Sequence, residues 1–416
     1  MVAIRTRTPF GSPAAGGGIV IPIAVPLLAD EEADAARAVV LSGWVSQGPQ
    51  VAAFEEEFAA LVGAPHACAV ANCTTALHLA LAALGIGSGD EVITVSHSFI
   101  ATANVIRYQG ATPVFVDIEP ETYNLDCARL AEAITERTRA IIAVHQMGMP
   151  CDMATLMAVA RRHGIAVIED AACAAGSQIC MNGQWEAIGK PHGDIACFSF
   201  HPRKVITTGE GGMLTTADAE LDRKFRLLRQ HGMSVPDIVR HGSQRVIFEE
   251  YVLVGYNYRM TDMQAAIGRK QLERLPQLIA RRRALASRYA ELLGNIEGLR
   301  LPFEPAWARS NWQSYCVRLP DRLDQRATMQ SLLDQGIATR RGIMCCHREA
   351  PYAGAGSRDD LRQSELAQDH AILLPLYAQM DCADQDRIVD AVKAELARSN
   401  RAATVAGHVS VCRDIL

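Results

Sequence analysis

A lysine, Lys204, stands in the stretch "FSFHPRKVITTGEGG" that runs from residue 198 to residue 212. Lysine is rare in this chain, because only five of its 41 basic residues are lysines and the others are arginines. A lysine amine can lose its proton and form a Schiff base with a carbonyl, whereas a guanidinium stays protonated. Lys204 therefore indicates imine chemistry, with an ordinary solvated lysine as the alternative interpretation.

Further candidate groups stand where predicted strands end, because ligands of open α/β sheets gather at the carboxyl ends of the strands. Asn72 can cap a helix whose free N–H groups suit a phosphate. Phe99 can stack on a planar ligand. Glu169 and Asp170 end the fifth strand, and only one of them can face a pocket because strand side chains alternate. Ser199 ends the sixth strand, just before the lysine.

Each of these groups alone has an ordinary interpretation as a helix cap, a core aromatic or a paired carboxylate. Together they supply a phosphate site, a stacking ring, a carboxylate for a ring nitrogen and a lysine for an aldehyde. These are the needs of pyridoxal 5′-phosphate (PLP), which the sequence predicts as the cofactor. No metal site is predicted, because no cysteine pair has the CxxC spacing of a zinc ligand set.

The elements that must position these groups alternate between strands and helices. Seven short apolar runs begin near residues 66, 91, 112, 140, 164, 195 and 212, and helical patterns cover residues 74–84, 127–136 and 153–163. Continuous apolar strands alternating with helices predict an α/β fold with a mainly parallel seven-stranded sheet. The last two runs lie close together, which predicts a hairpin-like edge.

The second half of the chain predicts a smaller domain. Residues 263–295 have the pattern of one or two helices that Pro276 bends or divides, and the arginine run at 281–283 is typical of a solvated helix face. A strand follows from residue 313 and a helix at 326–335. We expect a flexible tail at 1–18, a large domain at 19–271, a small α+β domain at 272–398 and a tail at 399–416.

The bulk composition excludes several classes of protein. The net charge is −5 and no basic run is present, which argues against nucleic-acid or membrane-surface partners. Prolines 22 and 26 interrupt the apolar stretch at 19–29, so a signal peptide or membrane span is not expected. Most of the twelve cysteines lie in apolar runs, as in a reduced, cytoplasmic protein.

Three segments, "IEDAA", "FSFHPRKVITTGEGG" and "GYNYRMTDMQAAIG", together resemble the DegT/DnrJ/EryC1/StrS family. The likeness spans about residues 20 to 395 and includes "LSGWVSQGP", "TYNLD" and "YCVRL". The resemblance implies an aspartate-aminotransferase-like fold (PLP fold type I), in a homodimer with shared active sites. It implies a sugar aminotransferase that uses PLP.

The resemblance also assigns roles to individual residues. Lys204 matches the imine-forming lysine, Asp170 the carboxylate at the pyridine nitrogen and Phe99 the stacked aromatic. Phosphate ligands are implied at Cys73, Thr74 and Ser199 and, from the neighbouring subunit, at Asn257. Two positions depart from the family pattern, because Cys73 stands where glycine is usual and Cys173, near the ring hydroxyl, where glutamine is often found. His347, Arg340 and Arg341 are the candidate acceptor contacts.

The implied reaction moves an amino group from L-glutamate or L-glutamine to a keto-sugar, chiefly a nucleotide-linked 4-keto or 3-keto deoxyhexose. Dehydrating relatives carry histidine at the lysine position, so Lys204 favours transamination. Two alternatives stay open. The acceptor can be a cyclitol or another ketone without a nucleotide, or the chain can be a non-catalytic PLP-binding regulatory protein.

Overall fold

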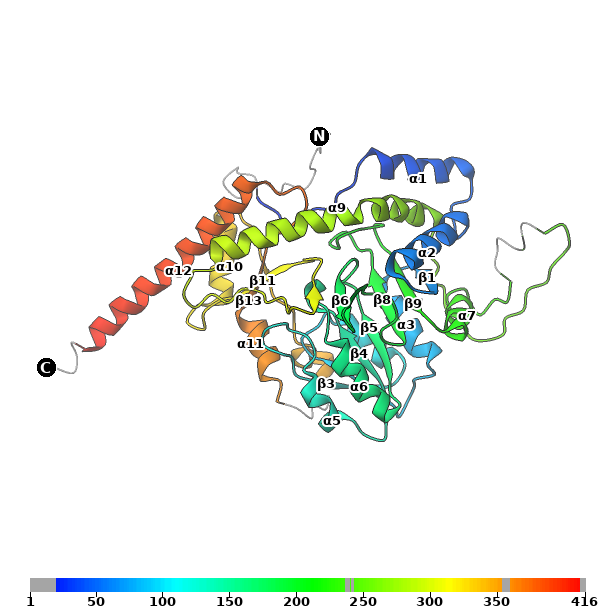
Figure 1. Ribbon diagram of the computed structural model, residues 1–416, viewed down its shortest axis with the longest axis horizontal. Coiled ribbons are helices and arrows are strands. Elements are labelled where there is room, and N and C mark those ends of the chain that lie inside the picture. The colour runs from blue at the N-terminus through cyan, green and yellow to red at the C-terminus, as the bar shows by residue number, and fades with distance from the viewer. Residues whose placement is uncertain (1–19, 236–239, 241–242, 354–359, 412–416) are drawn as a thin grey trace.

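The computed structural model describes residues 20–235, 240, 243–353 and 360–411, and its centre is a seven-stranded sheet (Figure 1). The strand order is β1-β9-β8-β5-β4-β2-β3. The strands are β1 (His66–Val70), β2 (Glu91–Val95), β3 (Thr112–Val116), β4 (Thr138–Val144), β5 (Ala166–Asp170), β8 (Ile195–Ser199) and β9 (Gly212–Thr216). All seven predicted runs are strands of this sheet, so the predicted α/β architecture is confirmed.

The sheet is parallel except for β9, which pairs antiparallel with both β8 and β1. The expected pairing of the last two strands is therefore confirmed, but its expected place at an edge is wrong. β9 lies between β8 and β1, the first strand of this sheet in chain order. β1 therefore covers the hydrogen-bonding groups that β9 would expose as an edge strand. Six strands consequently end at the same side of the sheet.

Helices cover both faces of the sheet, as continuous apolar strands require. Along β4, for example, Ile141 belongs to one buried cluster and Ile142 to the other, because successive side chains point to opposite faces. One face packs against α2 (Pro49–Val62), α6 (Met153–His163) and the first half of α9 (Asp262–Leu293). The other packs against α3 (Cys73–Ala83), α4 (Ala101–Tyr108) and α7 (Ala219–Leu228).

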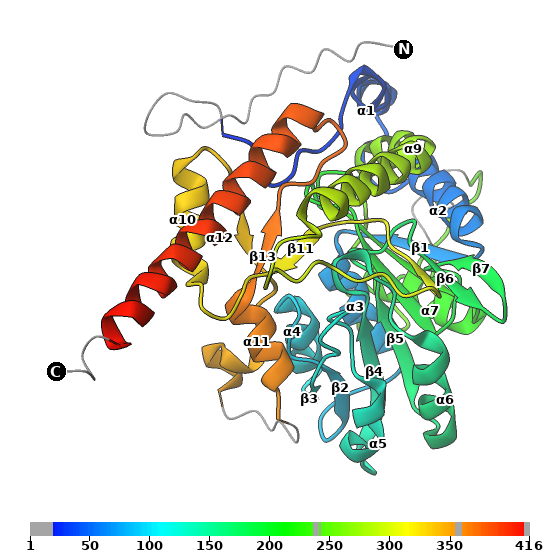
Figure 2. The ribbon, with the colours of Figure 1, turned by 60° about the vertical axis from the view of Figure 1, so that its left-hand side comes forward.

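A second core, here called the small domain, surrounds the three-stranded sheet β11-β13-β12 (Figure 2). Its elements are β11 (Tyr315–Arg318), β12 (Arg340–Arg341), β13 (Ala371–Leu374), α10 (Gln325–Asp334), α11 (Arg362–His370), α12 (Cys382–Val411) and the second half of α9. The predicted strand and helix of this region are confirmed. Ile21 also packs here, because its backbone pairs with that of Ile337.

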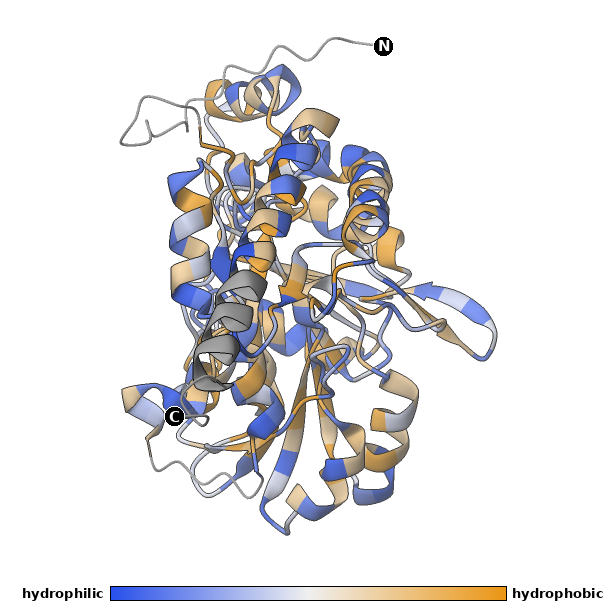
Figure 3. Ribbon diagram, turned by 90° about the vertical axis from the view of Figure 1, so that its left-hand side faces the viewer, coloured by the Kyte–Doolittle hydropathy of each residue, from blue (hydrophilic) through white to orange (hydrophobic). Residues whose placement is uncertain are grey.

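One uninterrupted helix, α9, joins the two cores, with Pro276 inside it. The expected domain boundary at residues 271 and 272 falls within this helix. Of the two expected tails, 1–18 lies outside the described residues, and 399–416 begins inside α12, whose backbone is helical to Val411. Figure 3 shows the apolar strands enclosed between helices with polar outer faces. No helix in the described part of the chain is long and apolar enough to span a membrane.

The expected solvated face at residues 281–283 is confirmed for Arg281, which is exposed, and wrong for Arg282. Arg282 is buried, and its guanidinium donates to the carbonyls of Trp312, Gln313 and Leu376 at 3.0–3.3 Å. A buried guanidinium needs acceptors, and these loop carbonyls supply them. The neighbouring arginines also donate to backbone carbonyls, Arg281 to Ala378 and Met380 and Arg283 to Arg309 and Ser310. The run therefore attaches α9 to the small domain.

A second small sheet was not anticipated from the sequence. Strands β6 (Gln178–Met181) and β7 (Gln184–Ala187) form a hairpin, and β10 (Ala308–Arg309) pairs with β6. The Asn182–Gly183 turn, in which both residues have positive φ, is the signal that could have revealed it. Further helical segments in the described part of the chain are α1 (Asp30–Ser42), α5 (Leu130–Ala133), η1 (Cys127–Arg129), η2 (Gln146–Gly148), η3 (Cys346–Arg348) and η4 (Ala350–Tyr352).

A buried ion pair ties α2 to α7 and β1. Glu55 accepts from Arg226 at 2.7 Å, from Arg229 and from the Ala69 N–H at 2.8 Å. Burial raises the pKa of the Glu55 carboxyl, but the two arginines outweigh burial, and the net pKa is lowered from 4.5. The ionised form is therefore the one that the fold stabilises.

We expect Glu55→Gln to lower the free energy of unfolding by about 3–5 kcal/mol, because it leaves buried arginine charge without its anion. Glu57→Gln on the same helix is the matched control, since Glu57 forms only a half-exposed pair with Arg269. Urea unfolding of both variants is the measurement. The pKa of Glu55 is lower in the folded state than in the unfolded state. The contribution of its carboxylate to the free energy of unfolding is therefore complete above pH 4.5 and is lost as pH falls through the lower folded pKa. A native-like dependence on pH in Glu55→Gln would contradict this assignment.

Candidate active site

The carboxyl ends of the parallel strands bring most of the predicted residues to one side of the sheet. Asp170 is the last residue of β5 and pairs with Cys197 of β8, two residues before Ser199. Phe99 follows β2 by four residues, and Cys73 follows β1 by three. Residues distant in the chain are therefore neighbours here because the strand register places them so.

Lys204 lies in the loop between β8 and β9, and its amine points to Cys173. The Nζ atom donates to the Cys173 Sγ at 3.0 Å, and the Lys204 backbone N–H donates to the His201 carbonyl at 2.8 Å. Burial lowers the pKa of the Lys204 amine, but Cys173, Cys73 and Asp170 outweigh burial, and the net pKa is raised. These surroundings therefore favour the protonated form of the Lys204 amine.

Asp170 and Glu169 face opposite ways, as the alternation of strand side chains predicted. Asp170 accepts from the Thr102 hydroxyl at 2.8 Å and from the Ala172 N–H at 3.2 Å. Glu169 turns to the other side, where it accepts from the Gly193 N–H at 2.9 Å and pairs with His145. Burial raises the pKa of the Asp170 carboxyl. A cation placed beside it would lower that pKa, which suits a protonated ring nitrogen.

The N-terminus of α3 lies beside the start of β9. Asn72 caps α3 by accepting from the Thr75 N–H at 2.9 Å, which leaves the first N–H groups of the helix for a ligand. A Cβ added to Gly212 would lie 2.5 Å from the carbonyl group of Asn72 and 2.8 Å from the Cys73 nitrogen. Only glycine fits where these two backbones approach.

Cys73 does not strain the turn it occupies. It is the first residue of α3 and is not among the residues with positive φ, so the loss of the glycine usual in the family has no conformational cost here. Its thiol is buried and lies 3.7 Å from the Cys197 carbonyl. Thr74, the next residue, and Ser199 at the end of β8 are half-buried and buried, respectively, at the same end of the sheet.

Two predicted residues are exposed. Phe99 has 64% of its surface accessible at the mouth formed by β2 and α4, where a planar ligand could cover it. Asn257 is exposed and accepts from Arg259 at 3.3 Å. Its neighbour Tyr258 accepts through its backbone carbonyl from the Ala71 N–H at 2.8 Å, so this segment runs beside the end of β1.

The candidate acceptor contacts are spread over the small domain. His347 bonds the Ser96 hydroxyl at 2.6 Å and Glu365 at 3.2 Å, so both ring nitrogens have protein partners. It reaches the end of β2 through Ser96. Arg340 and Arg341 are exposed on β12, and no hydrogen bond among the described residues connects them to Lys204 or Asp170. The structure therefore brings His347 near the strand ends and leaves both arginines apart from the Lys204 group.

Three further residues of this region had no signal of their own in the sequence. Thr102 of α4 bonds Asp170, and its only sequence hint is its place in "SFIATAN" beside Phe99. Asn311 donates to the Cys173 carbonyl at 2.8 Å, and Gln313 donates to the Arg203 carbonyl at 2.6 Å. Both come from more than 100 residues away in the chain, so local sequence cannot reveal them.

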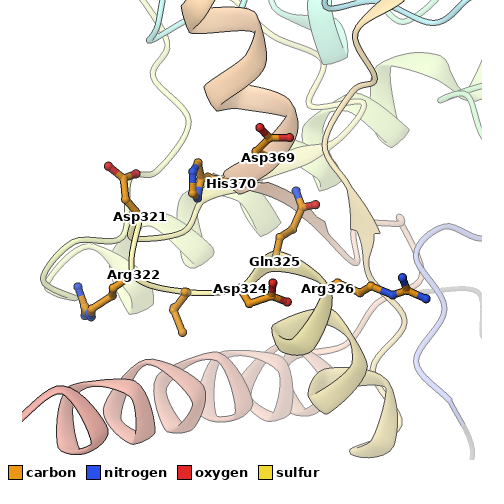
Figure 4. A pocket seen from close by; sticks show the side chains of 8 residues that line it. Asp321, Arg322, Asp324, Gln325, Arg326, Asp369 and His370 are labelled. Atoms are coloured by element: carbon orange, nitrogen blue, oxygen red, sulfur yellow. The ribbon is translucent and has the colours of Figure 1, made fainter. Parts of the chain in front are cut away.

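A hollow of about 430 Å³ opens elsewhere, at the N-terminus of α10 (Figure 4). It is lined by Asp321, Arg322, Leu323, Asp324, Gln325, Arg326, Asp369 and His370, none of which was predicted as a site residue. Its acidic and basic side chains point in different directions in Figure 4. No group of three or more potential metal ligands occurs in the described part of the chain. The hollow therefore has no chemistry comparable with that around Lys204.

Two named proteins have sequences similar to most of this chain. GDP-perosamine synthase from Caulobacter vibrioides is 42% identical over 377 residues, which cover 89% of this chain and 97% of that protein. The spore coat polysaccharide biosynthesis protein SpsC from Bacillus subtilis is 40% identical over 379 residues, or 90% of this chain and 96% of that protein.

Solved structures agree with the sequence comparison. The aminotransferase TlmJ from Streptoalloteichus hindustanus superimposes with a TM-score of 0.83 at 34% identity, covering 91% of this chain and 99% of that one. Spr1654 from Streptococcus pneumoniae in its PLP form gives 0.84 at 27% identity, with coverage of 91% and 99%. The model of the DegT/DnrJ/EryC1/StrS aminotransferase family matches residues 26–393. The chain therefore belongs to this family of PLP-dependent sugar aminotransferases.

Proposed function

We propose that this aminotransferase moves an amino group from L-glutamate or L-glutamine to a nucleotide-linked 4-keto or 3-keto deoxyhexose. The observation that carries the chemistry is the group formed by Lys204, Cys173 and Asp170 at the strand ends. The Lys204 amine lies 3.0 Å from the Cys173 thiol, and the Asp170 charge acts on it, so it can serve as a nucleophile and proton carrier once it has lost its proton.

The residues of this region fit PLP. The buried Asp170 needs a cationic partner, the N-terminus of α3 offers N–H donors to a phosphate, and Phe99 offers an exposed ring. Cys73, Thr74 and Ser199 would hold the phosphate, with Asn257 of a second subunit. When bound, PLP supplies an electron sink that makes the α-proton of an amino acid removable.

The chain itself supplies binding and proton transfer. Lys204 would hold the cofactor aldehyde through Nζ and, once released by the amino donor, carry a proton between the donor α-carbon and the cofactor as general base and acid. Asp170 would keep a proton on the ring nitrogen through a charge-assisted hydrogen bond, and Thr102 fixes the orientation of its carboxylate. Cys173 would contact the ring hydroxyl.

The acceptor class rests on similarity. The Caulobacter vibrioides relative is named a GDP-perosamine synthase, which favours a nucleotide-linked sugar over a free cyclitol. His347 would contact this acceptor near the end of β2, and Arg340 and Arg341 would contact its diphosphate. The alternatives are a cyclitol or other ketone without a nucleotide and, in a different class, a non-catalytic PLP-binding regulator. A cytoplasmic location stays a prediction.

We further propose a homodimer with shared active sites. Residues 243–256 expose an apolar surface that a lone subunit would present to water: Val246, Phe248, Tyr251, Val252 and Val254 are 56–91% accessible. Such patches mark protein interfaces. Asn257 follows directly on this segment, so a second copy docked there would receive it.

Replacing Lys204 with arginine should remove the absorbance of lysine-bound PLP and lower turnover by at least about 1,000-fold, because a guanidinium cannot form the imine. Lys190→Arg is the matched control, since Lys190 only pairs with Glu186 on the surface. Borohydride reduction followed by peptide mass spectrometry locates the modified lysine. If borohydride still fixed PLP to a residue of the Lys204→Arg protein, Lys204 would not be the lysine that binds the cofactor.

The acceptor is tested with a panel of ketones. Protein loaded with PLP is first mixed with L-glutamate or L-glutamine, and the cofactor absorbance should change, which a regulator without turnover would not show. Nucleotide-linked 4-keto and 3-keto hexoses are then compared with free keto-cyclitols. We expect kcat/KM for a nucleotide-linked sugar to exceed that for any cyclitol by at least about 100-fold, because the diphosphate adds charged contacts. The opposite order would support the cyclitol alternative.

A shared site predicts complementation between two inactive variants. Lys204→Arg and Asn257→Ala homodimers should both be impaired, whereas mixed dimers hold one site with native Lys204 and native Asn257. Unfolding and refolding an equal mixture should therefore restore activity above that of either variant alone. If each site used only its own chain, the mixture would show no more than the average of the two parents.

A further inference from the structure

The segment from Ser310 to Ser314, which joins β10 to β11, enters the large domain behind the loops that carry Lys204 and Cys173. Asn311 of this segment is completely buried. Its side chain donates to the carbonyls of Cys173 at 2.8 Å and Ala175 at 2.9 Å, and accepts from the Gln313 N–H at 2.8 Å. Asn311 therefore satisfies backbone groups of the Cys173 loop that would otherwise be buried without partners.

Gln313 makes the corresponding contact with the lysine loop. Its Nε2 donates to the Arg203 carbonyl at 2.6 Å, while its Oε1 has no partner among the described residues. The Arg203 carbonyl and the Lys204 nitrogen belong to one planar peptide unit. The N–H of that unit donates to the His201 carbonyl at 2.8 Å, so both its carbonyl and its N–H group are hydrogen-bonded.

The Cys173 loop is held in the same manner. Its carbonyl accepts from Asn311, and the N–H of the same peptide unit, from Ala174, donates to the Ala171 carbonyl at 2.8 Å. The Lys204 amine and the Cys173 thiol, 3.0 Å apart, thus each belong to a residue beside a peptide unit that is hydrogen-bonded at both ends. The N–H of each unit donates within its own loop, and the carbonyl accepts from Asn311 or Gln313.

The segment itself is firmly fixed. Arg282 of α9 donates to the carbonyls of Trp312 and Gln313, and Trp312 has a left-handed backbone with φ of 52°. Met147 opposite it also has a positive φ, 55°, and is followed by Gly148, where a Cβ would lie 2.0 Å from the Asn311 Oδ1. Bulky residues in this conformation persist only where the surroundings enforce it.

We propose that Asn311 and Gln313 are positioning residues that hold the Lys204 amine against Cys173 from the opposite side of the domain boundary. Neither side chain is assigned contact with cofactor or substrate. The inference rests on the proposed role of Lys204 in binding the cofactor. It adds that the seating of the small domain, through residues 311–313, sets the geometry of the chemical step.

The test uses the PLP-loaded protein and the substitution Gln313→Met, which keeps the side-chain length and removes the donor. We expect the pH midpoint of the lysine-bound cofactor absorbance to fall by at least about 0.5 unit, because the nitrogen at Lys204 loses its fixed place beside Cys173. We also expect kcat with the amino donor to fall roughly tenfold while its KM stays within about twofold. Gln313→Leu removes the same donor with another shape and should behave alike.

Gln325→Met is the matched control in the small domain, because Gln325 donates to the carbonyls of Gln368 and Ala371 at 2.8 and 2.7 Å. It should lower the melting temperature without moving the absorbance midpoint. Native midpoint and kcat in both Gln313 variants, or equal changes in Gln325→Met, would overturn the proposal. Borohydride labelling of Lys204 in the native protein tests the proposed role of Lys204 separately. If that labelling fails, the role of Lys204 is refuted, whereas the positioning role of Asn311 and Gln313 is decided by the Gln313 variants.

Discussion

The site depends on one constraint: a carboxylate and an amine must be kept at the end of a sheet whose interior is apolar. Burying such groups costs free energy unless each has partners. Asp170 obtains them from Thr102 and the Ala172 N–H, and Lys204 from Cys173. Thr102 lies in α4 after β2, Cys173 follows β5 and Lys204 follows β8, so the order and register of these strands must be correct before Thr102 can reach Asp170 and Lys204 can reach Cys173. The antiparallel strand β9 places Gly212 against Asn72 and Cys73, at the start of α3.

The two cores of the molecule are connected by more than a covalent link. Helix α9 runs through both, and its three consecutive arginines all donate to backbone carbonyls. A guanidinium carries several donors in a fixed plane and can hold two or three carbonyls at once. A buried arginine without a carboxylate is unusual, and burial lowers the pKa of Arg282 to about 10, which still leaves it charged at neutral pH. That charge, solvated by carbonyls, holds Trp312 and Gln313 on α9. From this fixed segment Asn311 and Gln313 reach the loops of the site.

The sequence was sufficient for features that depend on local pattern. Apolar runs identified all seven strands of the large sheet, Asn72 was recognisable as a helix cap, and strand alternation separated Asp170 from Glu169. It was insufficient where long-range contacts decide. The arginine run has the charge of a solvated face, and only the packing of the small domain buries Arg282. The pairing of β1 with β9 likewise joins residues far apart in the chain, 150 positions for His66 and Thr216, which no local pattern encodes. The β6–β7 hairpin does have a local signal, the Asn–Gly turn that joins its two short strands.

The two cysteines that depart from the family pattern differ in what they change. Cys73 takes the place of a glycine, but the backbone there is helical, so its side chain simply turns inward toward Cys197 and the N–H donors are kept. Cys173 replaces an amide that can both donate and accept, and a thiol is a weak donor and acceptor. Its backbone is nevertheless held by Asn311, and its sulfur accepts from the Lys204 amine. We therefore expect Cys173 to make a weaker contact with the ring hydroxyl than an amide would, beside its direct contact with the lysine.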